Sequence, residues 1–430
     1  MKHEGRIFAA FVLVTWLSIY SPATAQEELY GVGERAHAST APATRATTRP
    51  APRRAAVRNP KNIVDRLVQI ESADAWSDGS MTNAIVRPEA PARLELGYRE
   101  RGFPRTGTWT SDEEKSEFPF TRLIASFNVA TPPDTGVLLE VRVKQAETWS
   151  PWIYMQSWGK VVQELDRPLK WDGGKLETDE LVLTKPADQY QARLTLISFG
   201  FDAKVTPSVR RLSVCYSGIV DDDATRKRLN PPTTLPSKWA RDLKVPFRGQ
   251  GATDNPKPIR GMICSPTSVS MVLEYHGVNH TTVENAMAIY DPHFDLFGNW
   301  GRAVSRAGEV GLDAWLTRFR DWDAVKSEIA NGNPVIASIF FERGEVRGFI
   351  YERTAGHLLV IRGFTPTGDV IVNDPASRDK GNGAIYPAAE FARAWFDNGG
   401  VGYVIHKPAA PAIVRSPTTA PTTAPVSFSR

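Results

Sequence analysis

Residues 264–277 read CSPTSVSMVLEYHG and predict a helix that begins at a cysteine. Pro266 suits the first turn of a helix, where its missing N–H is not needed, and Gly277 is a natural stop. One face of this helix carries the side chains expected to be buried, which are Val269, Val272, Leu273 and His276. Cys264 therefore sits at or just before the helix N-terminus, where unpaired amides and the helix dipole favour a thiolate.

A buried structural cysteine near a helix start would give the same local pattern. Other features of the chain are therefore needed to decide between a structural and a chemical role for Cys264. The chain has only two cysteines, Cys215 and Cys264, too few for the disulfide scaffold of many exported proteins. A single bond between these two is a further alternative. A chain that is almost free of cysteine and keeps one in this setting favours a chemical role for Cys264.

Residues 356–374, GHLLVIRGFTPTGDVIVND, predict a β-hairpin with its turn at TPTG. Folding the two strands about that turn places Val360 opposite Ile371 and His357 opposite Asp374, with Cβ atoms about 4.5–5.5 Å apart. A carboxylate at this spacing can orient an imidazole, which can then take the proton of a thiol. An incidental surface pair is the alternative, and a one-residue slip of register would separate the two side chains.

Gln250 precedes the cysteine helix in the stretch VPFRGQ, residues 245–250. Its side-chain amide, together with the backbone N–H of Cys264, could donate hydrogen bonds to the negative oxygen that develops in acyl transfer. A solvated loop glutamine is the alternative reading of the same residue.

The order Gln250, Cys264-Ser-Pro-Thr-Ser, His357 and Asn373-Asp374-Pro375 resembles the papain-like cysteine peptidases related to the bacteriocin-processing, double-glycine-leader peptidases. The likeness covers about residues 245–406. In that family the glutamine donates to the oxyanion, the cysteine is the nucleophile, the histidine is the base and the aspartate orients it. The resemblance implies these roles for Gln250, Cys264, His357 and Asp374, and it implies no cofactor.

Two features depart from the family pattern. Ser265 follows the cysteine where many relatives have glycine, and the gap between Gln250 and Cys264 is longer than in the transporter-fused peptidases. The sequence contains neither a transporter domain nor a Walker A nucleotide loop. The family's role in leader-peptide export is therefore not carried over to this chain.

Residues 62–217 predict an all-β sandwich, because short runs of β-branched and aromatic residues recur between turn signals. The expected strands are 93–98, 123–129, 138–144, 152–158, 190–199 and 209–216. Five tryptophans in this half could be exposed and serve as a sugar-binding platform, and ordinary core and edge packing of the sandwich is the favoured alternative: Trp109, Trp149, Trp152, Trp158 and Trp171. This half also resembles the N-terminal part of secreted members of the same broad family.

The N-terminus predicts a cleaved signal peptide, since Lys2 and Arg6 precede an apolar run (7–20) and the A-x-A site at residues 23–25. An uncleaved anchor is the alternative. The predicted segments are a signal peptide (1–25), an Ala/Thr/Pro/Arg-rich linker (26–61), the β-sandwich (62–217), a polar connector (218–243), the peptidase domain (244–407) and a disordered tail (408–430). We therefore expect a secreted or periplasmic protein with no integral membrane segment after cleavage.

The bulk properties exclude several classes. A formal net charge of +4 over 430 residues, without a dense basic stripe, does not suggest a nucleic-acid partner. His276 and His280 are four residues apart, but Gly277 ends the helix between them, so zinc is not expected. The acidic triplet 221–223 is expected to be a solvated turn.

The predicted fold is multidomain, an all-β sandwich followed by an α+β papain-like cysteine peptidase domain. The predicted function is an exported cysteine peptidase that hydrolyses peptide bonds through a Cys-His-Asp triad and a thioester acyl-enzyme. Its partner would be a peptide or protein substrate, with cell-wall or glycan contact through the sandwich as a further expectation. Two alternatives remain: transamidation or cell-wall peptide hydrolysis by the same thiol, and a non-catalytic binding protein that works through the sandwich.

Overall fold

The computed structural model describes residues 62–161, 168–199, 204–231 and 233–408. The predicted signal peptide, the linker up to residue 61 and the tail from residue 409 lie outside these residues. Within the described ranges, no helix is both long enough and apolar enough to pass through a bilayer.

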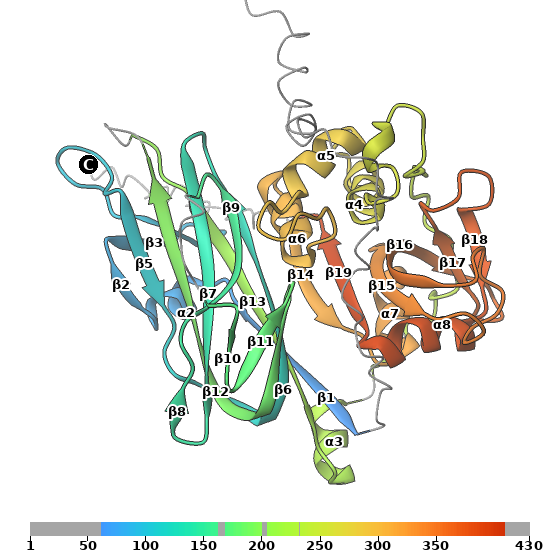
Figure 1. The fold of residues 1–430 in the computed structure, drawn as a ribbon, viewed down its shortest axis with the longest axis horizontal. Helices are drawn as coiled ribbons and strands as arrows, with labels where there is room; N and C mark the ends of the chain where they lie inside the picture. Colours follow the sequence, from blue (N-terminus) through green and yellow to red (C-terminus); the bar gives the residue numbers. More distant parts are fainter. Residues whose placement is uncertain (1–61, 162–167, 200–203, 232, 409–430) are drawn as a thin grey trace, which may run out of the picture. The chain divides into compact units, whose positions relative to one another are not determined.

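The N-terminal domain is built almost entirely of antiparallel strands (Figure 1). Its elements are β1 (Ile63–Ile70), α2 (Ala73–Ser77), β2 (Ser80–Thr82), β3 (Ala84–Arg87), β4 (Arg93–Leu96), β5 (Thr106–Thr110), β6 (Glu114–Ala130), β7 (Thr135–Gln145), β8 (Thr148–Trp149), β9 (Ile153–Gly159), β10 (Lys170–Trp171), β11 (Gly174–Glu177), β12 (Glu180–Ser198) and β13 (Ser208–Ile219).

The long strand β12 joins the two layers of this β-sandwich. Its first half pairs with β6, in the layer whose strands follow the order β10-β11-β12-β6-β13-β4-β3. Its second half pairs instead with β7 and β5, and β7 continues to β9. Val141 and Val143 of β7 are buried, as their alternation predicts, but Glu140 on the opposite face is buried too. Both faces of β7 are therefore covered, and Glu140 accepts a hydrogen bond from Arg193.

The tryptophans of this domain pack rather than form an open platform. Trp109 and Trp158 are 1% and 5% exposed, so both pack inside the sandwich and neither offers a ring to a sugar. The Arg142 guanidinium lies 4.6 Å from the Trp149 ring centre and 4.9 Å from that of Trp152. Cation–π contacts of this kind cover faces that a sugar would need.

The connector after the sandwich begins with a short helix, α3 (Asp223–Leu229). The carboxylate of Asp222 accepts a hydrogen bond from the Thr225 amide at 2.7 Å and so caps the helix N-terminus. The acidic triplet is exposed, as expected, but it marks the start of a helix rather than a plain turn, because Asp222 caps α3 and Asp223 begins it.

The C-terminal domain has a six-stranded antiparallel sheet in the order β14-β19-β15-β16-β17-β18. Its strands are β14 (Asp313–Arg318), β15 (Val335–Phe341), β16 (Thr354–Phe364), β17 (Val370–Asn373), β18 (Asn382–Tyr386) and β19 (Val401–His406). Its helices are η2 (Lys257–Ile259), α4 (Cys264–Tyr275), α5 (Thr282–Ile289), α6 (Trp300–Glu309), α7 (Trp322–Ala330), α8 (Ala388–Trp395) and η3 (Phe396–Asn398).

Helix α4 begins at Cys264, as its sequence predicts, and is buried on all sides from Ser265 to Leu273. Gly277 has a φ of +90°, the left-handed conformation that lets the chain leave the helix. The two cysteines are both free, and Cys215 is buried in β13 while Cys264 is half-buried. The disulfide alternative is therefore wrong.

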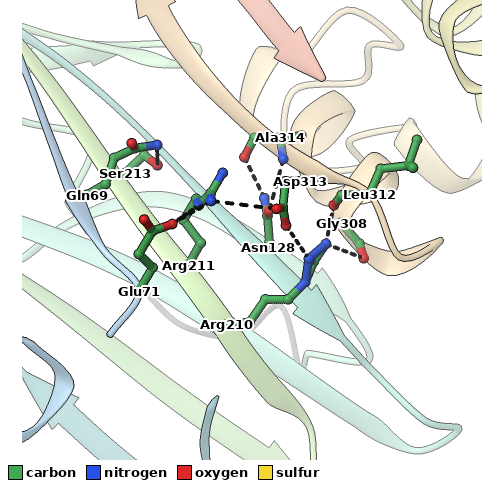
Figure 2. Close-up of polar contacts among 10 residues, drawn as sticks. All are labelled: Gln69, Glu71, Asn128, Arg210, Arg211, Ser213, Gly308, Leu312, Asp313 and Ala314. Atoms are coloured by element: carbon green, nitrogen blue, oxygen red, sulfur yellow. Dashed lines mark hydrogen bonds and ion pairs between the residues drawn. The ribbon is translucent and has the colours of Figure 1, made fainter. Parts of the chain in front are cut away.

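The sandwich covers the free edge of strand β14, which lies beside β6 in Figure 1. The Asn128 amide donates to the Ala314 carbonyl at 2.6 Å and accepts from the Ala314 N–H at 3.0 Å (Figure 2). The Ser126 hydroxyl accepts from the Leu316 N–H at 3.1 Å. Two side chains thus supply the hydrogen bonds that a further strand would otherwise make.

Charged side chains also lie at the contact between β14 and the sandwich. Arg210 of β13 forms an ion pair with Asp313 at 2.9 Å and also donates to backbone carbonyls of the peptidase domain (Figure 2). Arg318 of β14 pairs with Glu180 of the sandwich, and both side chains are almost fully buried. The boundary between the two domains therefore combines these polar contacts with apolar packing, since Ile124 and Cys215 of the sandwich belong to the buried core of the peptidase domain.

Replacing Asn128 tests this interface. Asn128→Ala leaves the N–H and the carbonyl of Ala314 buried without partners, so we expect a loss of about 3 kcal/mol in the free energy of unfolding. Urea denaturation of the whole chain measures it. The matched control is Asn62→Ala, which removes an exposed bond to Asp221 and should cost about 0.5 kcal/mol or less. Equal stability of the two variants would contradict the assignment.

Candidate active site

His357 and Asp374 meet at one end of strands β16 and β17. The Nε2 atom of His357 lies 2.8 Å from Oδ1 of Asp374. Asp374 is 0% exposed and His357 is 6% exposed, so the pair is shielded from water. A carboxylate can only accept, so Nε2 carries the hydrogen and the other ring nitrogen is left for a different partner.

The predicted register of this hairpin is wrong, although the two side chains still meet. Val360 pairs with Asn373 rather than with Ile371, which is a shift of two residues. Because side chains alternate with a period of two, an even shift keeps His357 and Asp374 on the same face. Asp374 follows the last residue of β17 and reaches His357 as a diagonal neighbour.

The turn alone shifts the pairing by three residues, since Phe364 pairs with Val370, and a β-bulge at Arg362 takes one residue back. The connector runs alongside this point, where the Leu243 N–H donates to the Arg362 carbonyl at 2.8 Å. The Arg362 guanidinium also binds both carboxylate oxygens of Asp242, at 2.6 and 2.8 Å. Gly363 allows this close approach, since a Cβ atom there would lie 2.1 Å from the Arg241 carbonyl oxygen.

The Cys264 side chain, at the first residue of helix α4, lies close enough to the His357 imidazole to interact with it. The backbone N–H groups of Leu358 and Ser265 also lie near its sulfur. No side chain caps this helix, so its N-terminal amides and dipole face the thiol. The structure thus brings together three of the four predicted site residues in the order thiol, imidazole, carboxylate.

The electrostatics of the three groups favour a charged pair. Burial raises the pKa of Cys264, but the hydrogen bond and charge of His357 outweigh it and leave the pKa below its ordinary value. Burial lowers the pKa of His357, but Asp374 and the thiol bring it up to about 10. Burial also opposes ionisation of Asp374, yet its donors hold that pKa below the ordinary value. A thiolate beside an imidazolium is the expected state at neutral pH.

Gln250 lies beside the Asp374–Pro375 turn, where its backbone N–H donates to the Pro375 carbonyl at 2.9 Å. Its side-chain Nε2 donates to the Arg260 carbonyl at 3.1 Å. The Asn373 amide fixes the incoming chain by donating to the Val245 carbonyl at 3.0 Å. The structure therefore brings Gln250 to the carboxylate end of the site, with one of its two side-chain N–H groups already used.

Sequence reasoning missed two tyrosines at this site. The hydroxyls of Tyr351 and Tyr386 both donate to Oδ2 of Asp374, at 3.0 and 2.7 Å. Tyr351 lies in the segment before β16 and Tyr386 ends β18, so neither is close in sequence to Asp374. The only available signal was the aromatic run Phe349-Ile350-Tyr351 directly ahead of the predicted strand.

Ser265, which departs from the family pattern, sits inside the domain. It is buried, and its hydroxyl lies 3.2 Å from that of Tyr403.

His276, a candidate metal ligand in the sequence, contacts the Ile405 carbonyl at 2.9 Å. Among the residues that the structure describes, no group of three His, Cys, Asp or Glu side chains is arranged to hold a metal ion.

A half-exposed thiol beside a buried imidazole, itself bonded to a carboxylate, is an arrangement that cysteine-dependent hydrolases and acyl transferases use. Residues 242–403 match the model of the Peptidase_C39 like family, and residues 66–217 match that of the Peptidase C39 N-terminal domain. The two matches fall on the two domains in turn, and the resemblance inferred from the residues is confirmed.

Solved structures give distant matches. A double glycine motif protease from an AMS/PCAT transporter, solved with the leader peptide, is 18% identical; the match covers 39% of this chain and 94% of that one, with a TM-score of 0.26. A C39-like peptidase from Bacillus anthracis is 15% identical, with 40% and 100% covered and a TM-score of 0.31.

The sandwich has its own distant match. The C-terminal CBM6 domain of LamC from Zobellia galactanivorans is 13% identical, with 35% of this chain and 98% of that chain covered and a TM-score of 0.20. A comparison with curated protein sequences returned no significant match.

Thiol labelling tests the electrostatics of the site. We expect iodoacetamide to alkylate Cys264 at about pH 6, where an ordinary thiol is almost wholly protonated. Cys215 is the internal control, because burial raises its pKa to about 12. His357→Ala should slow the labelling of Cys264 about tenfold or more, since the thiolate loses its counter-charge. Mass spectrometry of each cysteine peptide gives the rates, and equal, slow labelling of both would contradict the proposed pair.

Proposed function

We propose that this protein is an exported cysteine peptidase that hydrolyses peptide bonds through Cys264, His357 and Asp374. The observation that carries the proposal is the contact of 2.8 Å between His357 and Asp374, with the Cys264 thiol beside the same imidazole. The match of residues 242–403 to a peptidase family supports peptide as the substrate class. Within the described residues the site needs no metal, because the thiolate itself is the nucleophile.

The chemistry follows from the protonation states. The Cys264 thiolate attacks the carbonyl carbon of the scissile bond, and the carbonyl electrons move to its oxygen. When the tetrahedral intermediate collapses, the C–N bond breaks and the His357 imidazolium gives its proton to the leaving amine. His357, now neutral, takes a proton from water, whose oxygen attacks the thioester. The acid product leaves, and Cys264 returns as a thiolate beside imidazolium.

The oxyanion formed in each step needs donors. We assign this role to the backbone N–H of Cys264 and to the second N–H of the Gln250 side chain. The first N–H of that side chain is bonded to the Arg260 carbonyl, which would fix the amide in one orientation. The tie between the Gln250 N–H and Pro375 supports the assignment, since it joins the glutamine to the turn that carries the carboxylate.

The domain arrangement that we propose is papain-like. Helix α4 supplies the nucleophile from its N-terminus, while the antiparallel sheet supplies the base and the carboxylate. Helix α4 packs against β16, the strand that carries His357. This division of the catalytic groups between a helix and a sheet supports the α+β arrangement inferred from the sequence.

Export is part of the proposal and rests on the sequence. The basic start at Lys2 and Arg6, the apolar run of residues 7–20 and the A-x-A site support a cleaved signal peptide and a secreted or periplasmic location. For the sandwich, we propose a structural partnership with the peptidase domain rather than a glycan platform. The covered faces of Trp149 and Trp152 support this choice.

Cleavage of a mixed peptide library tests the function. We expect the wild-type chain to cleave the library and Cys264→Ala to fall to background, because the nucleophile is lost. Cys215→Ala is the matched control and should keep its activity, since that thiol is buried away from the site. Mass spectrometry of the products gives the result.

The same experiment separates the alternatives. Release of ammonia with an amine donor would favour transamidation, and release of fragments from cell-wall peptide would favour wall hydrolysis. If the wild-type chain gives no product in any of these assays while its Cys264 remains reactive, peptide hydrolysis is the wrong assignment. Cleavage by Cys264→Ala at the wild-type rate would contradict the nucleophile.

A further inference from the structure

Asp374 receives four hydrogen bonds, two on each oxygen. Oδ1 accepts from His357 Nε2 at 2.8 Å and from the Ala376 N–H at 3.0 Å. Oδ2 accepts from the hydroxyls of Tyr351 at 3.0 Å and Tyr386 at 2.7 Å. A carboxylate offers about four acceptor sites, so the acceptor capacity of Asp374 is fully used. The two tyrosines are not part of the proposed triad, and the triad alone does not explain them.

Aromatic packing fixes the positions of both hydroxyls. The Phe349 ring stacks on Tyr386 with centres 4.1 Å apart and planes at 24°. Phe341 stacks on Tyr351 with centres 5.7 Å apart and planes at 10°. The run Phe349-Ile350-Tyr351 thus aims two donors at one oxygen.

Tyr351 also touches the base itself. Its ring meets the His357 imidazole edge-on, with centres 5.5 Å apart and planes at 78°. Burial, followed by the negative charge of Asp374, raises the pKa of both tyrosine hydroxyls. Both hydroxyls therefore stay protonated and act as donors over the whole range in which the thiol chemistry operates.

We propose that Tyr351 and Tyr386 are positioning residues that keep Asp374 ionised and turn its Oδ1 toward His357. This inference rests on the proposed function of the triad. A carboxylate that is 0% exposed would favour its neutral form, and each donor to its oxygens opposes that tendency. Because the hydroxyls occupy Oδ2, only Oδ1 can face the imidazole, which fixes the ring and its tautomer.

The pH dependence of Cys264 labelling tests the role without needing a substrate. If Asp374 becomes protonated, His357 loses its counter-charge and Cys264 loses its thiolate. Losing one hydroxyl raises the pKa of Asp374, so the acid-side midpoint of iodoacetamide labelling should move up by about one pH unit in Tyr351→Phe and in Tyr386→Phe. The double variant should move further. Phenylalanine keeps the ring stacking, and Tyr351 is only half-buried, so this variant tests the idea even if Tyr386→Phe unfolds.

The matched control is Tyr290→Phe. Its hydroxyl donates to Asp295 at 2.7 Å, which is the same chemistry outside the site, and its loss should leave the labelling profile unchanged. A wild-type midpoint near that of an ordinary thiol would overturn the triad itself. Rapid wild-type labelling, with an unshifted midpoint in folded Tyr351→Phe and Tyr386→Phe, would overturn only the positioning role. A shift equal to that of Tyr290→Phe would overturn it as well.

Discussion

The burial of one negative charge, that of Asp374, is the constraint on which the peptidase domain depends. An ionised carboxylate away from water is unfavourable unless its oxygens are satisfied. Here the donors come from four places: His357 on β16, Ala376 after β17, Tyr386 on β18 and Tyr351 in the segment before β16. Strands β16, β17 and β18 must therefore be neighbours, in this order, for the charge to exist.

The same charge sets the state of the thiol. His357 is buried, and on its own it would be neutral; the neighbouring Asp374 makes the imidazolium the stable form. The imidazolium in turn holds the Cys264 sulfur as a thiolate at the start of helix α4. The position of the Asp374 carboxylate thus determines the reactivity of the Cys264 thiol, which lies on a different element, helix α4.

At the opposite edge of the sheet, the unpaired groups belong to the backbone of strand β14. Strand β14 would expose unpaired backbone groups, and Asn128 and Ser126 of the sandwich satisfy them with side-chain atoms. The buried pair of Arg318 and Glu180 holds the same boundary. Removing one partner from such a pair leaves an uncompensated charge, so separating the two domains at this contact costs free energy.

Much of this could be predicted from the sequence where the signal is local. Alternation and turn residues located the strands around β7 and β13, and Pro266 and Gly277 marked helix α4. The predicted hairpin register is wrong because the turn alone shifts the pairing by three residues and the bulge at Arg362 takes one back. The bulge lies where Arg362 binds Asp242 of the connector, 120 residues away in sequence. The sequence predicts only a turn at the acidic triplet, because the helix that Asp222 caps is too short to show a period.

Other features have no local signal at all. Tyr351 and Tyr386 reach Asp374 only after three strands have paired, and nothing in the residues around them indicates a carboxylate partner. Asn128 meets Ala314 across 186 residues, so its role depends on how two domains pack. The roles proposed for Cys264 and His357 could be inferred from the sequence because helix starts and strand pairs are themselves short-range features.

The ultraviolet absorbance of the thiolate, measured as the difference between the wild-type chain and Cys264→Ser across pH, tests the central claim most directly. If Asp374 stabilises the imidazolium of His357 and that charge holds the sulfur, the thiolate band is already present at neutral pH and falls only in acid. A band that is absent at neutral pH and appears with a midpoint near 9, the ordinary value for a cysteine, would contradict the account.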